Sequence, residues 1–181
     1  MEEPVARPSA TSEAATSEAD GARTRPDTAE GASSRRGTRY EDDLYSWVRE
    51  QVEHLRAGRV DALDLANIAE ELDDVGIAQY HRLESALRVL LMHMLKWDQQ
   101  PEKRSRSWVC SIAEQRSRIS RLLHKNPGLK SRIEEACDEA YESAVRWAAQ
   151  ETGLVESDFP QEQPYAWNDI LNRPFDLDAD R

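Results

Sequence analysis

The chain has little cysteine and no long apolar run, and these two absences argue against a disulfide-rich protein and a membrane-spanning one. Its only cysteines, Cys110 and Cys137, are too few for a disulfide framework and suit a reducing compartment. The longest uncharged apolar run, Val89–Leu95, has seven residues, whereas a membrane-spanning helix needs about 20. The N-terminus lacks the apolar segment of a signal peptide. We therefore expect a cytoplasmic protein with no membrane-spanning segment.

Motifs of the common enzyme classes are also missing. We find no nucleophilic triad, no CxxC or HExxH motif and no glycine-rich phosphate loop, and the seven glycines are scattered. Sustained alternation of apolar and polar residues, which would indicate a strand, does not occur either. The sequence thus predicts an all-α protein and leaves its enzymatic status open.

Charge is unevenly distributed along the chain. The formal net charge is -11, yet residues 96–132 carry ten basic and three acidic groups. The segments on either side are acidic: residues 40–95 hold twelve acidic and five basic groups, and residues 133–181 hold thirteen and three. The chain therefore contains one basic block between two acidic ones.

Helical periodicity begins after a polar N-terminal segment. Residues 1–39 are too poor in large apolar side chains to form a core, so we expect a disordered tail there and a second one at 177–181. Between them, residues 40–176 predict one helical domain, an antiparallel bundle of about five helices covered by a C-terminal strap rich in proline and aromatics. The expected helices span residues 40–57, 64–76, 77–98, 105–126 and 127–153, and a short one lies near 165–171.

The second expected helix is amphipathic. Asp64 can cap its N-terminus, and we expect Gly76 to end or kink it. One face is apolar and carries Leu65, Ile68, Ala69, Leu72 and Val75.

Carboxylates on the other face could hold a divalent metal. Glu70, Glu71 and Asp74 follow Asn67 at helical spacing, and oxygen ligands suit divalent cations. Glu84 lies within the apolar arc of the third expected helix and could join them if the chain turns at Gly76. The simpler interpretation is a solvated acidic face and an internal ion pair for Glu84.

The most apolar segment, Leu83–Trp97, contains a single histidine. A helix that is apolar on nearly every side belongs at the centre of a fold, so we expect His93 to be a packed, hydrogen-bonded core residue. Spacing along the helix separates it from the acidic face, which argues against a metal site shared with Glu70 or Glu71. We assign Trp47, Trp97 and Trp108 to the core as well.

The basic block could hold phosphate through Arg104, Arg106 and Arg116. Phosphate contacts need arginine and lysine on one surface. Trp108 is in register with Ile112 and Ile119, which favours a core position over a base-stacking one. Pairing with the acidic segments, within one chain or between copies, is favoured over nucleic acid.

Several sequence blocks resemble bacterial domain-of-unknown-function family 29 over about residues 40–175. They are YEDDLYSWVREQVEHLRAGRVDALDLANIAEELDDVG, LLMHMLKWDQQPEKRSRSW, EQRSRISRLLHKNPGL and ETGLVESDFPQEQPY. The resemblance implies a mostly helical fold and supplies no activity. The family often has glutamate at the position of Asp74. Its pattern points to Asn67, Glu70, Glu71, His93, Lys96, Trp97, Arg104, Ser105, Trp108 and Arg116.

Three functions remain open at this stage. The favoured hypothesis is a non-enzymatic interaction module that binds another copy or a protein partner through its complementary charges. A metal-dependent enzyme acting on a phosphate-containing or nucleic-acid substrate is the first alternative, and it needs the carboxylates within about 10 Å of the arginines. A nucleic-acid-associated regulator is the second, and it depends on the basic block alone.

Overall fold

A computed structural model describes residues 37–177 of the chain. Residues 1–36 and 178–181 lie outside the described residues, and with them nearly all of the two expected disordered tails. The chain divides into two compact units, residues 1–50 and 51–181. The described residues are all-α and contain no strand, which confirms the predicted fold class.

The first unit contributes the start of helix α1 (Leu44–Arg56) and the turn before it. The Asp43 carboxylate accepts a hydrogen bond from the Ser46 backbone N–H at 3.0 Å, which caps the helix. Trp47 is buried, and its ring meets Tyr40 edge-on at a centroid distance of 5.0 Å. These contacts fix the entry of the chain into α1.

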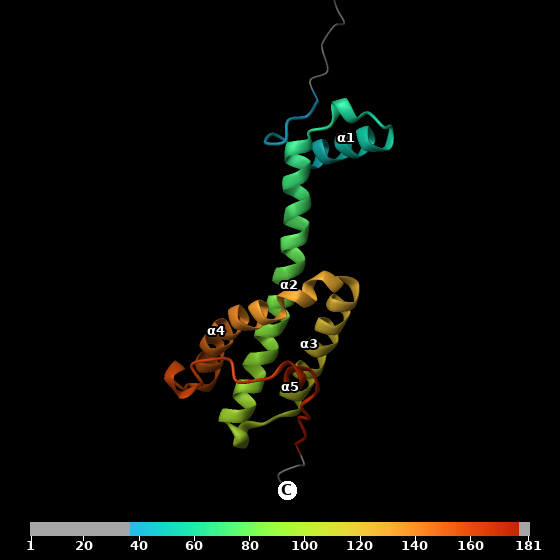
Figure 1. Cartoon of the computed structure of the whole chain (residues 1–181). Helices are drawn as coiled ribbons and strands as arrows, with labels where there is room; N and C mark the ends of the chain where they lie inside the picture. The colour runs from blue at the N-terminus through green and yellow to red at the C-terminus, as the bar shows by residue number, and fades with distance from the viewer. Residues whose placement is uncertain (1–36, 178–181) are drawn as a thin grey trace, which may run out of the picture. The chain divides into compact units, whose positions relative to one another are not determined.

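The second unit is built around one long helix, α2 (Leu65–Gln99). Helices α3 (Arg106–Lys125) and α4 (Ile133–Thr152) pack along its C-terminal half, and the short α5 (Trp167–Asn172) lies in the strap that follows (Figure 1). The 3-10 turns η2 (Pro101–Lys103) and η3 (Pro127–Arg132) join α2 to α3 and α3 to α4. The predicted bundle with a C-terminal strap is therefore present.

The core of this unit lies on the segment expected to be central. Leu83, Leu87, Leu90 and Leu91 are completely buried. They pack against small residues of α4 and large ones of α3, which allows the three helices to approach closely. The other buried members of this core include Met94, Leu95, Ile112, Ile119, Ala136, Ala140, Ala144, Ala148, Phe159 and Ile170.

Gly76 neither ends nor kinks a helix into two, contrary to the sequence prediction. Helix α2 runs through it without a break and has 35 residues in all, and a side chain at this position would meet nothing within 4 Å. A single glycine costs a helix only about 1 kcal/mol, which is too little to interrupt a helix whose C-terminal half is stabilised by packing in the core. Gly153, by contrast, adopts a left-handed φ of 78° and terminates α4 as expected.

None of the helices among residues 37–177 combines the length and the apolarity needed to cross a membrane.

Candidate functional site

The N-terminal part of α2, residues 65–79, extends beyond the bundle, and we call it the arm. Its start is fixed by Asp64, whose carboxylate accepts hydrogen bonds from the Asn67 backbone N–H at 3.3 Å and from the Asn67 side chain at 2.7 Å. The Gln51 side chain in turn accepts the Asp64 backbone N–H at 2.9 Å. In Figure 1 the arm is the green part of α2 that extends beyond the region where α3 and α4 pack against the helix.

The apolar face of the arm is exposed. Leu65, Leu72 and Val75 keep 61%, 66% and 59% of their surface accessible, and Ile68 is partly exposed. The spacing of these four residues, three and four apart, produces a continuous apolar stripe along one side of the helix, which we call the seam. A bundle of five mutually packed helices would have buried it. The seam is therefore an apolar surface that the packing of α3 and α4 on α2 leaves exposed.

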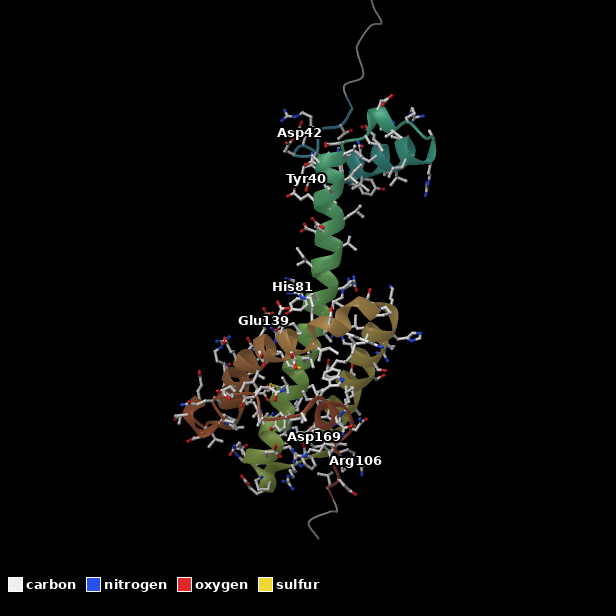
Figure 2. All side chains as sticks on the ribbon, in the orientation of Figure 1. Tyr40, Asp42, His81, Arg106, Glu139 and Asp169 are labelled. Carbon is white, nitrogen blue, oxygen red and sulfur yellow. The ribbon has the colours of Figure 1, made fainter. Side chains whose placement is uncertain are left out.

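The base of the arm is held by contacts from α4 and η3. The Tyr80 hydroxyl donates to the Glu139 carboxylate at 2.7 Å, and the Arg132 guanidinium lies 3.9 Å from the centre of the Tyr80 ring. Burial, together with the hydrogen bond to Glu139, raises the pKa of Tyr80. Figure 2 shows His81 and Glu139 at this junction. Tyr80 is the first buried residue of α2, and the arm that precedes it has no buried residue.

The four candidate metal ligands do not converge. Glu70, Glu71 and Asp74 lie on the arm, whereas Glu84 is about 20 Å farther along the same helix, at 1.5 Å per residue from Glu71. Because α2 does not turn at Gly76, no hairpin brings them together. Glu84 instead forms an ion pair with Arg88 at 3.4 Å. Among residues 37–177, no three side chains of His, Cys, Asp or Glu are grouped in a way that could hold a metal ion.

His93 lies among polar groups from two helices, Lys96 of α2 and Glu151 of α4. It is half-buried, and its Nδ1 has no hydrogen-bond partner among the described residues. Burial lowers the pKa of His93, the Lys96 charge lowers it further, and the Glu151 carboxylate opposes both. Lys96 is buried, pairs with Glu151 and lies 4.5 Å from the centre of the half-buried Trp108 ring. This cluster joins the ends of α2 and α4 to the start of α3.

Two of the three candidate phosphate ligands are engaged within the chain. Arg116 donates to three backbone carbonyls of the strap, those of Ile170, Arg173 and Asp169, at 2.8, 2.8 and 3.0 Å. Arg104 donates to the Trp97 carbonyl at 3.1 Å and lies over the buried Trp97 ring. Arg106, labelled in Figure 2, is exposed at the start of α3.

The acidic arm is also far from Arg104. About 35 Å of helix separates Asp74 from Trp97, over whose ring Arg104 lies, at 1.5 Å per residue. The metal-dependent mechanism required about 10 Å between the two groups. The structure therefore places the carboxylates of the arm and Arg104 near opposite ends of α2.

Sequence reasoning missed the residues that fasten the strap. Asp98 accepts two hydrogen bonds from Arg173, at 2.9 and 2.6 Å, and one from the Tyr165 hydroxyl at 2.8 Å. The Phe175 ring meets Trp97 edge-on at 5.3 Å. The aromatic residues of the strap indicated that it packs on the bundle, but no local pattern pairs Asp98 with a residue 75 positions later.

The sequence over residues 39–176 matches the model of a protein family described as Domain of unknown function DUF29, so the chain belongs to that family. Neither the search of curated proteins nor the search of solved structures finds a match. The family match confirms the resemblance drawn from the sequence blocks and leaves the function to be argued from the site.

Proposed function

We propose that this DUF29 member is a non-enzymatic interaction module, and that its arm docks an amphipathic helix of another protein. The exposed seam carries this proposal. Leu65, Leu72 and Val75 form one exposed apolar stripe on a helix whose C-terminal half supplies most of the buried core. Contiguous apolar surface of this kind is typical of a binding site for another chain.

The spacing of the seam suits a helix as the occupant. Leu65, Ile68, Leu72 and Val75 occupy the positions that pack knobs into holes in paired helices. Burying each of the three largely exposed side chains would contribute about 1 to 2 kcal/mol. Their sum, about 3 to 6 kcal/mol, reaches only the lower end of the free-energy cost of association, so a partner helix must also make contacts beyond these three side chains.

The geometry gives less support to the metal-dependent enzyme. Three of its four candidate carboxylates lie on the arm, the fourth pairs with Arg88, and Arg104 and Arg116 donate to backbone carbonyls of the chain itself. An interaction module does not require the carboxylates and the arginines to converge, and it accounts for the exposed apolar seam of the arm.

The first test asks whether the seam belongs to the fold or to a partner. We expect Leu72→Ser to change the free energy of unfolding by less than about 0.5 kcal/mol, because the side chain is largely exposed. The same change at the buried Leu87 should cost more than about 3 kcal/mol. If Leu72→Ser destabilises the chain as strongly as Leu87→Ser in urea unfolding, the seam is part of the core and the proposal fails.

The second test asks whether the seam contacts another protein. A photo-crosslinking residue at position 72 of the full chain should capture a protein in cells, and the same residue at Ile77 should not. Ile77 is also exposed, but it lies on the far side of the helix. The captured protein, once purified, should bind the wild-type chain and fail to bind Leu72→Ser. Equal crosslinking from both positions would contradict the proposal.

A further inference from the structure

We infer that the exposed face of α3 binds the phosphate backbone of a nucleic-acid duplex. This inference goes beyond the proposed function and uses a surface other than the seam. Residues 103–132 contain nine basic side chains and one acidic one, Glu114. Helix α3 makes up most of this segment, and it packs against α2 through Ile112, Ile119 and Leu123. Its opposite face is open to solvent.

Three cations form one stripe along this open face. Arg118, Arg121 and Lys125 are spaced three and four residues apart, so they lie on the same side of the helix. All three side chains are exposed. At 1.5 Å per residue they cover about 10 Å of the helix axis, and we call them the basic stripe.

The acidic segments of the chain do not neutralise the basic stripe. Other cations of the same segment are engaged: Arg116 donates to the strap, and Arg132 pairs with Glu135 at 2.6 Å. No residue of the basic stripe forms an ion pair within residues 37–177. Several uncompensated cations on one face of a helix indicate an anionic partner.

The surroundings of the basic stripe suit phosphate better than a protein surface. The large apolar side chains that are exposed among residues 37–177 include none from α3 or η3. A protein interface has an apolar core inside a polar rim, and this face supplies only the rim. Binding to a phosphate backbone needs cations, and the release of condensed counterions drives it without apolar contact.

A duplex suits this face better than a single strand. Proteins that bind single strands stack the bases on exposed aromatic rings. Trp108, the one Trp, Tyr or Phe residue of α3, is half-buried, and the Lys96 ammonium lies 4.5 Å from the centre of its ring. A duplex keeps its bases stacked and presents about one phosphate per 1.7 Å of its axis, so the stripe meets several phosphates in any register. Such contacts do not read the base sequence.

Glu114 opposes this contact locally. It lies one turn before Arg118 on the same face of α3, where its carboxylate repels phosphate. The net charge of -11 belongs to the whole chain, and salt at 0.1 M screens exposed charges beyond about 10 Å. The cations that touch the backbone therefore outweigh the distant acidic groups.

The test measures binding of the full chain to a short labelled DNA duplex of arbitrary sequence and to the matching RNA duplex. Fluorescence anisotropy at about 50 mM salt should give a Kd of about 1 to 100 μM for at least one of them. The logarithm of the binding constant should fall against that of the salt concentration with a slope of about -3, since each neutralised phosphate contributes about -0.9. Binding of either duplex supports the inference, and the tighter one identifies the nucleic acid.

Four variants locate the contact. Arg121→Gln should weaken binding about fivefold and make the salt slope shallower by about 1. Arg146→Gln on α4 is the matched control and should change neither, because both arginines are exposed and donate a hydrogen bond to a serine of their own helix. Glu114→Gln should tighten binding, because it removes the carboxylate beside the stripe. Leu72→Ser should bind like the wild-type chain, because it alters only the seam.

The opposite results would overturn the inference. If neither duplex binds at about 50 mM salt, the face does not bind nucleic acid. Equal weakening by Arg121→Gln and Arg146→Gln would mean that overall charge, and not the basic stripe, drives binding. Tighter binding of a single strand or of polyglutamate would identify a different occupant. None of these results involves Leu72, so failure here leaves the proposed function of the seam standing.

Discussion

Replacing Arg116 with methionine should release the strap from the bundle. Arg116 reaches from α3 to three carbonyls at the end of α5, and its three nitrogens donate one hydrogen bond each. Methionine keeps the aliphatic stem and removes all three donors. A hydrogen bond from a charged donor contributes about 1 kcal/mol or more, so we expect a loss of about 2 to 4 kcal/mol.

Two measurements on the Arg116→Met variant test this reasoning. In urea, with a slope of about 2 kcal/mol per molar, the unfolding midpoint should fall by about 1 to 2 M. Hydrogen exchange should accelerate in α5 more than in α4, because the strap loses its attachment first. Arg118→Met is the control, since Arg118 is exposed two residues away on the same helix. Equal midpoints for the two variants, with unchanged exchange in α5, would refute the reasoning.

Three further predictions concern single residues. Burial lowers the pKa of His93, so below its ordinary value of 6.5 the unfolded chain binds more protons than the folded one. Stability should therefore fall as the pH falls through 6.5, and His93→Phe should flatten this acid-side slope in denaturation curves taken from pH 8 to pH 5; an unchanged slope contradicts the assignment. Burial raises the pKa of the Cys137 thiol to about 11, whereas Cys110 is exposed. A thiol reagent at about pH 8 should thus modify one cysteine in the native chain and two in urea, and fast reaction of both in the native chain would be inconsistent with the buried position. Gly76→Ala should raise helix content and stabilise the arm by about 0.5 to 1 kcal/mol, because Gly76 lies in the interior of an exposed helix; a loss of circular dichroism at 222 nm would mean that α2 is interrupted there.

Local sequence signals were enough to predict most of the helices. Periodic apolar residues and terminating signals such as Gly153 act over a few positions, so they can be read without knowing the fold. The buried segment around Leu83–Trp97 was predictable for the same reason, because a helix that is apolar on nearly all sides is stable only when other elements surround it. These local signals were sufficient to predict the all-α class, which the structure confirms.

The candidate site could not be predicted in the same way, because it depends on contacts between segments that are distant in the sequence. Gly76 is a helix breaker by propensity, but whether it ends α2 depends on what the next residues pack against. The apolar face with Leu72 follows the same rule as the core helices, and only the tertiary structure reveals that nothing in the bundle covers it. The missing partner of His93 Nδ1 and the attachment of Asp98 to Arg173 are set by contacts between distant segments.

Because α2 is unbroken at Gly76, the number of residues between the seam and the core determines the direction in which the seam faces. Because arm and bundle share one backbone helix, each residue inserted between Val75 and Tyr80 would turn the seam by about 100° around the helix axis and move it about 1.5 Å outward. Inserting four residues would nearly restore its direction, whereas inserting two would turn it to the opposite side. The number of residues between Val75 and the core therefore determines which way a docked partner is oriented, independently of how tightly it binds.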